Sequence, residues 1–284
     1  MTQERSETIT LISADHKLLD LRLDEVWEYR DLITLYARRS LVATYKQTVL
    51  GPLWLILNPL LTAIVYMFIF GNVAGLSTEG VPRIVFYLMS NATWILFSTV
   101  AIQCADTFVK NADVFGKVYF PRLTIPCSVI LVSLFQFAVQ FVLGVCIGLY
   151  YSFTSDFSFT FARWPLIIPL IVLESLMALG FGIIASNLTT RYRDLRVLVD
   201  FGIRLWMFVT PVVYPLSQFG GSYLETVLTF NPMTAPLEAM RWCLWGTGQP
   251  SFLGLAYFCM VTIAVLLVGI VLFNKVERTF MDTV

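Results

Sequence analysis

The residues of this sequence that could do chemistry inside an apolar protein are few, and they are charged. Residues 187–214 begin with charges gathered between Arg191 and Arg196, and they continue as an apolar segment that contains Asp200 and Arg204. An arginine that deep in a hydrophobic segment is tolerated only when it faces an opposite charge, the protein interior or a water-filled cavity. The sequence therefore predicts a polar interior within an apolar chain.

Glu174 is the carboxylate that we expect to pair with Arg204. Each lies about ten residues from the end of its apolar segment, and the two segments run antiparallel, so at about 1.5 Å per residue both fall near the middle of a bilayer. Charges inside a membrane generally find partners. We predict an ion pair between Glu174 and Arg204; the alternative is that Arg204 contacts an anionic group in transit.

The sequence offers no constellation for catalysis or metal binding. Its single histidine, His16, lies in a polar amino-terminal arm, and its five cysteines are scattered without a CxxC pair. The apolar segments carry neither histidine nor clustered carboxylates, which disfavours an intramembrane lipid-modifying enzyme. We therefore predict no catalytic, cofactor-binding or metal site.

The sequence also offers no nucleotide-binding loop. The only Gly-Lys pair, Gly116 and Lys117, has Asn111 where a GxxxxGK[ST] loop needs glycine and Val118 where it needs serine or threonine. If ATP drives this protein, a separate subunit must hydrolyse it.

The composition is that of an integral membrane protein. Of the 284 residues, 57% are hydrophobic and only 13% charged, against roughly 25% charged in soluble domains. The net charge is zero, so a nucleic-acid partner is not expected. We predict an all-α protein with six membrane spans, because six segments reach the roughly 20 residues needed to cross. They are residues 52–70, 84–108, 123–151, 164–188, 195–214 and 252–273.

The positive charges predict the orientation of these spans. Placing residues 1–46, loops 109–122 and 189–196, and the tail after Asn274 on one side collects 15 of the 19 lysines and arginines. The other four are Arg83, Arg163 and Arg241 on the outer side and Arg204 within the membrane. Positively charged loops are typical of the cytoplasmic side. Both termini are therefore predicted to be cytoplasmic.

The chain before the first span divides into two parts. Residues 1–23 form a polar arm without the apolar core of a signal peptide, and residues 24–50 are predicted to form an amphipathic helix in the membrane interface. Residues 51–275 follow as the membrane domain, and residues 276–284 as a cytoplasmic tail. The apolar residues that recur at helical spacing before the first span are Val26, Tyr29, Ile33 and Tyr36.

The cytoplasmic loop 110–122 is unusual because it is apolar. Asn111 can cap a short helix, in which Asp113 complements the positive end and Lys117 the negative end. We expect this helix to contact a partner; the alternative is a merely solvated connection. The candidate contact residues are Asn111, Asp113, Val114, Phe115, Lys117 and Tyr119.

The outer connection, residues 215–250, is too apolar to be a flexible, solvated loop. Glycines and prolines divide it into pieces, of which 223–230 and 233–245 are too short to span a membrane. We predict two re-entrant half-helices that dip into the outer leaflet, where protein or a water-filled cavity satisfies their ends. The alternative is a small extracellular cap.

Several motifs occur together in one order. They are LGPLWLILNPLL at residues 50–61, YRDLR at 192–196, LVDFGIRLWMFVTPVVYPLS at 198–217, NPM at 231–233 and LEAMRW at 237–242. With them the chain resembles, from about Leu32 to Lys275, the permease subunits of ABC transporters that export O-antigen, teichoic acid and capsular polysaccharide.

The resemblance implies a homodimer of six-span subunits in a bacterial plasma membrane, with two copies of a separate ATPase subunit that bind ATP and magnesium. It implies a polysaccharide substrate on a polyprenyl-diphosphate lipid, whose diphosphate is then the alternative partner of Arg204. The loop helix near residues 111–119 matches the element that docks on the ATPase. The alternatives are a drug or lipid exporter of the same superfamily, and a self-sufficient channel or ion-coupled transporter, for which we see neither an acidic relay nor repeated halves.

Aromatic residues make up 15% of the chain, and several share helix faces in the first and fifth spans. Aromatic rings can stack on sugars with few directional demands, so they are typical of a channel wall along which a glycan slides. The alternative is that they fill space or anchor helices at the membrane interfaces. The channel candidates are Tyr66, Phe70, Phe201, Arg204, Trp206, Phe208 and Tyr214.

Overall fold

The computed structural model describes residues 23–111, 115, 117, 120–192 and 194–280. Within these ranges every regular element is a helix, so the prediction of an all-α protein is confirmed. Five helical segments there are long and apolar enough to cross a membrane, which makes the chain a multi-pass membrane protein. They are Gly51–Val73, Arg83–Ala105, Thr124–Thr154, Phe161–Thr190 and Phe252–Asn274.

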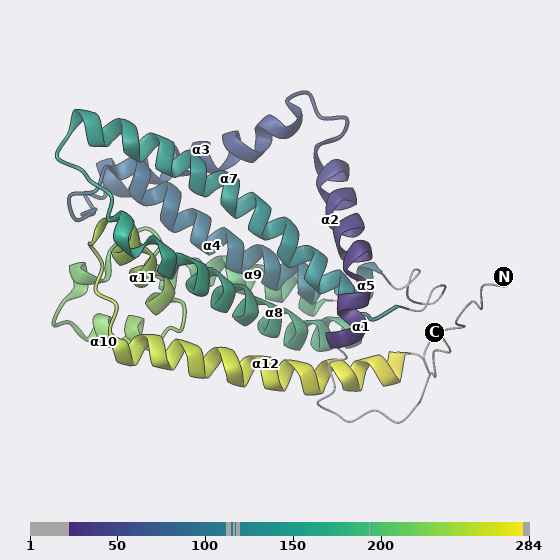
Figure 1. Cartoon of the computed structure of the whole chain (residues 1–284). Helices are drawn as coiled ribbons and strands as arrows, with labels where there is room; N and C mark the ends of the chain where they lie inside the picture. The colour runs from purple at the N-terminus through teal and green to yellow at the C-terminus, as the bar shows by residue number, and fades with distance from the viewer. Residues whose placement is uncertain (1–22, 112–114, 116, 118–119, 193, 281–284) are drawn as a thin grey trace, which may run out of the picture.

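These five segments contain the long helices of the bundle (Figure 1). They are α3 (Trp54–Tyr66), α4 (Arg83–Ala105), α7 (Thr124–Thr154), α8 (Ile167–Arg191) and α12 (Phe252–Phe280). Short helical segments of other types extend two of them. The 3₁₀-helix η1 (Gly51–Leu53) and the π-helix η2 (Met67–Val73) flank α3, and the 3₁₀-helix η3 (Phe161–Leu166) precedes α8. Their ends differ from the predicted spans by a few residues, and α12 is longer.

The helix α4 lies at the centre of the bundle. It packs against α3, α7, α8 and α9 (Leu195–Val209), and most of its residues are buried. Its polar residues Ser90, Asn91 and Thr93 are buried as well. α4 is therefore the framework against which the other helices are positioned.

Small residues allow α8 to pack closely on both neighbours. A Cβ atom at Gly182 would lie 2.6 Å from the Cβ atom of Cys104 in α4, and one at Gly269 of α12 would lie 3.1 Å from the carbonyl oxygen of Gly180. Such contacts are typical of membrane helices, whose association depends on close packing because lipid is as apolar as the side chains. α8 is thus fixed between α4 and α12.

The helices α1 (Leu23–Glu28) and α2 (Arg30–Tyr45) form the region predicted to be an interface helix. α2 runs across the bundle helices rather than along them (Figure 1), and it packs against α7. Ala37 is buried, whereas Leu35 and Val42 are mostly exposed. A helix parallel to a membrane surface would have this orientation, and the interfacial position itself stays a prediction.

The fifth predicted span differs from the structure. α9 ends at Val209 after 15 residues, about 22 Å at 1.5 Å per residue, which is shorter than a bilayer core of about 30 Å. Thr210 is extended because it precedes Pro211, and proline disfavours the helical conformation in the residue before it. Since α8 and α12 run in the same direction (Figure 1), α9 and the non-helical residues after it together return the chain to the other end of the bundle.

The outer connection contains the two short helices that the sequence predicts. After the turn η4 (Leu216–Phe219), α10 covers Tyr223–Thr229 and α11 covers Thr234–Trp245. α11 is buried along most of its length and ends at Gly246, whose φ of 80° is the left-handed conformation that favours glycine. How deeply the pair enters a membrane stays a prediction.

The loop that is predicted to be cytoplasmic begins after α5 (Thr107–Lys110). Asp113, Val114 and Tyr119 lie outside the described residues, so the short helix expected in this loop also stays a prediction.

Candidate functional site

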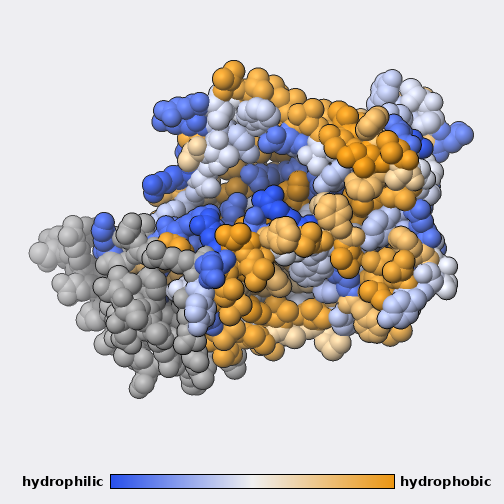
Figure 2. Space-filling view, turned by 180° about the vertical axis from the view of Figure 1, so that it is seen from behind, coloured by the Kyte–Doolittle hydropathy of each residue, from blue (hydrophilic) through white to orange (hydrophobic). Residues whose placement is uncertain are grey.

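The helix α9 turns one face into the protein and one face out of it. Ile203 is buried, and Val199, Trp206 and Met207 pack against the core. In Figure 1, α9 lies behind α4 and α8. Figure 2 shows the molecule from behind, where this side is hollowed. Hydrophilic residues line the recess, and hydrophobic residues lie on both sides of it. We call the exposed residues of this helix beyond Arg196, apart from Gly202, the α9 face; they are Val197, Leu198, Phe201, Arg204, Leu205, Phe208 and Val209.

An ion pair lies along the α9 face. Arg204 Nε is 3.0 Å from Asp200 Oδ2, and the two side chains are 72% and 38% exposed. Residues four apart lie one above the other on a helix, so Asp200 reaches Arg204 without any neighbouring helix.

The predicted ion pair between Glu174 and Arg204 is therefore wrong. Glu174 of α8 is only 1% exposed, and its Oε1 atom makes no hydrogen bond within the described residues. Equal depth in a membrane does not bring two side chains together, because the direction in which each points around its helix axis decides. Glu174 points into the bundle, whereas Arg204 points out of it.

The position of this ion pair limits what can lie against the α9 face. Arg204 is nine residues beyond Leu195, about 14 Å along the helix, so it lies far from the inner end of the bundle although its side chain points outward. A charged pair that faced hydrocarbon there would lose its hydration, which is strongly unfavourable. The α9 face is therefore suited to contact water, a polar ligand or another protein chain rather than lipid.

The aromatic candidates of the first span lie beside α9. Tyr66 and Phe70 pack edge to face with their ring centres 5.8 Å apart, and the Tyr66 hydroxyl is 3.4 Å from the sulfur of Met207. The structure thus brings the end of α3 to the last turn of α9. Phe201 and Phe208 are about half exposed on the α9 face, whereas Tyr66 contacts Met207, which packs against the core.

Trp206 has different surroundings. Its ring packs against Trp94, Phe97 and Phe181, with ring centres 5.3 to 6.1 Å apart, and its Nε1–H group donates a hydrogen bond of 3.1 Å to Asn231 Oδ1. These are the contacts of a side chain that holds α9 on α4 and α8. Trp206 therefore has a packing role in this structure, which the alternative interpretation of the aromatic residues foresaw.

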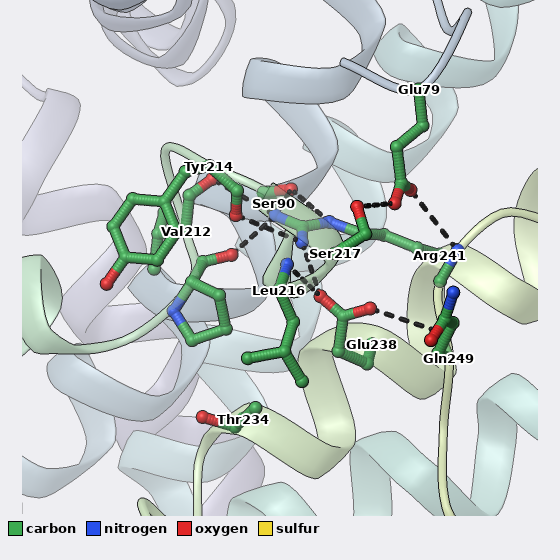
Figure 3. A network of polar contacts seen from close by, with 12 residues as sticks. Glu79, Ser90, Val212, Tyr214, Leu216, Ser217, Thr234, Glu238, Arg241 and Gln249 are labelled. Atoms are coloured by element: carbon green, nitrogen blue, oxygen red, sulfur yellow. Dashed lines mark hydrogen bonds and ion pairs between the residues drawn. The ribbon is translucent and has the colours of Figure 1, made fainter. Parts of the chain in front are cut away.

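The outer end of α9 is held by Arg241 of α11. Its buried guanidinium donates hydrogen bonds to the carbonyl oxygens of Pro211, Val212 and Tyr214, the last two at 3.3 Å, and also bonds Ser90 Oγ of α4 (Figure 3). These carbonyls follow the break in α9, where no helical N–H group is available to them. Arg241 thus replaces the missing helical hydrogen bonds.

Two carboxylates complete this outer network (Figure 3). Glu238 lies 2.8 Å from Arg241 and accepts hydrogen bonds from the backbone N–H groups of Leu216 and Gln249. Glu79 accepts from the Ser217 hydroxyl and from the N–H group of Gly248. The network therefore joins α4, α11 and both loops around the short outer helices.

The sequence analysis missed this network, because it treated Arg241 as an outer loop charge. Two signals were present. Glu238 and Arg241 are three residues apart in a helical segment, which favours an ion pair, and Pro211 predicts a helix break that exposes carbonyl groups. Tyr214 belongs to this end of α9 too, since its hydroxyl donates a hydrogen bond of 3.0 Å to the carbonyl of Phe208.

The inner end of α9 is held by a second network. Asp106, whose side chain is 3% exposed at the turn between α4 and α5, lies 2.9 Å from Arg196 of α9 and 2.8 Å from Lys110 of α5. Both ends of α9 are thus attached to the bundle by charged side chains.

The predicted partner-contact residues lie just beyond Asp106, and three of them are described. Asn111 donates a hydrogen bond of 2.8 Å to the carbonyl of Thr107, and Lys117 is exposed. Phe115 is buried within the chain, with its ring 5.9 Å from that of Phe108 and 5.5 Å from that of Phe120. In this structure the Phe115 side chain therefore packs against its own chain and is not exposed for a partner.

The described residues form a helical multi-pass bundle with an ion pair on the exposed face of an amphipathic helix. The model of the ABC-2 type transporter family matches residues 31–245 of this chain. The chain belongs to the ABC-2 type transporter family.

Curated relatives cover most of the chain. It is 29% identical over 255 residues to the O-antigen export system permease protein RfbA of Klebsiella pneumoniae, which covers 89% of this chain and 94% of that protein. It is 29% identical over 269 residues to the protein of the same name from Myxococcus xanthus, with 92% and 98% covered. Identity to the polysialic acid transport protein KpsM of Escherichia coli is 22% over 238 residues, with 82% and 89% covered. The resemblance to polysaccharide-export permeases is confirmed.

Proposed function

We propose that this chain is the transmembrane subunit of an ATP-driven exporter that moves a polysaccharide, carried on a polyprenyl-diphosphate lipid, out of the cytoplasm. The names of the relatives, O-antigen and polysialic acid export proteins, support the substrate class. The ion pair between Asp200 and Arg204 is the observation that carries the proposal, because it puts charges on an exposed and otherwise apolar face of a bundle helix, about 14 Å from its inner end.

The α9 face lines the export path in this proposal. Its exposed aromatic rings, Phe201 and Phe208, offer flat surfaces for sugar rings, and the neighbouring ion pair keeps water in the path. Arg204 is also the cation that the diphosphate of the lipid carrier meets, since it is more exposed than its partner Asp200. A phosphate group would compete with Asp200 for the guanidinium.

The working assembly contains two copies of this chain and two copies of a separate ATPase subunit. One copy exposes the α9 face on its surface, and a second copy facing it would enclose a path between them. The ATPase subunits bind ATP and magnesium and dock at the loop of residues 111–119, so this loop and both termini lie in the cytoplasm. The assembly is in the plasma membrane of the bacterium.

An export assay tests this function. In cells that lack the chain, the lipid-linked glycan should accumulate inside and disappear from the surface, and the wild-type chain should restore it. Arg204→Gln and Asp200→Asn should assemble with the ATPase but restore less surface glycan. Glu225→Gln should restore it fully, because it neutralises a partly buried carboxylate of α10 and keeps an oxygen that can accept from the Gly221 N–H group. Normal surface glycan in cells without the chain would refute the proposed function.

A further inference from the structure

The turn between α4 and α5 joins the ATPase end of the chain to the α9 face. Asp106 in this turn is buried, and each of its carboxylate oxygens has a cation: Oδ1 lies 2.9 Å from Arg196 Nε, and Oδ2 lies 2.8 Å from Lys110 Nζ. Asp106 is five residues before Asn111, the first residue of the proposed docking loop, and Arg196 is the second residue of α9.

The two ion pairs of Asp106 differ in what they connect. Lys110 is four residues from Asp106, so this pair lies within one stretch of chain. Arg196 comes from a distant segment, so its pair with Asp106 holds α9 to the turn. A buried carboxylate stays where its partners are, because leaving it without a compensating charge is strongly unfavourable.

Neighbouring contacts attach this turn both to α8 and to the loop that follows α5. Thr189 near the end of α8 donates a hydrogen bond of 2.7 Å to the carbonyl of Ala105, so the segments before and after residues 192–194 are both bonded to this turn. On the other side, the ring of Phe108 packs 5.9 Å from that of Phe115, which belongs to the loop. A displacement of the loop therefore reaches residues 105–106 through packed side chains.

We propose that the ion pair between Asp106 and Arg196 is the mechanical link through which ATPase-driven movement of the loop at residues 111–119 moves α9. This inference rests on the proposed function. Arg196 is then a positioning residue, which acts on the export path through α9. The outer end of α9 is attached separately by Arg241, so movement at Arg196 changes the inner end of the path relative to the outer end.

The matched pair Arg196→Gln and Lys110→Gln tests the link in the assembled complex with its ATPase. Each variant removes one of the two described cations from Asp106, and both cations are about half exposed, but only Arg196→Gln separates α9 from the turn. Arg196→Gln should lower glycan exported per ATP hydrolysed about tenfold, with ATP hydrolysis itself within about twofold of wild type. Lys110→Gln should keep the wild-type ratio.

A second measurement does not depend on the substrate. A single cysteine replaces Phe201 on the α9 face after the native cysteines have been removed, and its reaction rate with a thiol reagent is measured with and without a non-hydrolysable ATP analogue. The rate should respond to the nucleotide in the wild-type background and with Lys110→Gln, but not with Arg196→Gln.

The outcomes separate the link from the function it serves. A nucleotide response that persists with Arg196→Gln, or that both variants abolish equally, would overturn the link. Loss of ATP hydrolysis and export in the same proportion would also overturn it, because Arg196 would then only support assembly. A response that follows the predicted pattern in a complex that exports no glycan would refute the proposed substrate and leave the link standing.

Discussion

Arg241 donates a hydrogen bond to the carbonyl oxygen of Pro211, 30 residues earlier in the chain, at the point where α9 has ended. The same guanidinium bonds Val212, Tyr214, Ser90 and Glu238. One buried side chain therefore satisfies the backbone at a helix break and attaches the end of α9 to α11.

Arg241→Gln should strongly destabilise the protein. The change leaves Glu238 buried without its cation and several carbonyls without donors, and the loss of one partner from a buried ion pair is worth about 3 to 5 kcal/mol. Thermal unfolding in detergent measures it. Arg163→Gln is the control, because Arg163 is less enclosed and lies 4.0 Å over the Trp242 ring; equal unfolding temperatures for the two variants would contradict the role of Arg241.

Trp206→Ala should mainly lower the stability of the protein, whereas Phe208→Ala should mainly reduce export. Trp206 is packed among three aromatic rings, so its removal should lower the free energy of unfolding by about 3 kcal/mol. Phe208 is half exposed, so its removal should change stability by less than about 1 kcal/mol but reduce export. Unfolding and surface glycan are measured for both; a destabilised Phe208→Ala with normal export would reverse this assignment.

Glu174→Gln should be tolerated. Glu174 lacks the Arg204 partner, and one of its oxygens makes no hydrogen bond, so a neutral side chain of the same shape removes a buried ionisable group without breaking a described ion pair. We expect equal or higher stability and unchanged export. A loss of more than about 2 kcal/mol in unfolding free energy would show that the carboxylate has a stabilising partner in the assembly.

Cysteines at Asp194 and Glu225 should report opposite sides of the membrane. Both residues belong to exposed segments, one between α8 and α9 and the other in α10. In a cysteine-free background, a membrane-impermeant thiol reagent should label Glu225→Cys in intact cells and Asp194→Cys only after the cells are opened. Labelling of Asp194→Cys in intact cells would contradict the proposed topology.

The sequence was sufficient to predict the helical class and most of the spans, because long apolar segments and their flanking charges carry that information directly. It was also sufficient for the two short outer helices, whose limits are set by Asn231, Pro232 and Gly246. These features are local, so they do not depend on which neighbours a helix meets.

The errors concern which way side chains point. Hydropathy gives the depth of Glu174 and Arg204 but not their direction around the helix axis, and packing against α4 turns the Arg204 side of α9 outward. In the same way, Arg241 counts as one outer positive charge in the sequence, yet its partners come from two distant segments, α4 and residues 211–214. Contacts of this kind follow from the fold as a whole.

Crosslinking during export tests most directly whether the α9 face lines the glycan path. A photo-reactive amino acid at Phe208, on that face, is compared with the same amino acid at Met260, which is also exposed but lies on α12. In membranes that contain the assembled exporter, ATP and the lipid-linked glycan, position 208 should form a glycan adduct and position 260 should form lipid adducts only. Glycan adducts at position 260 with none at position 208 would contradict the account.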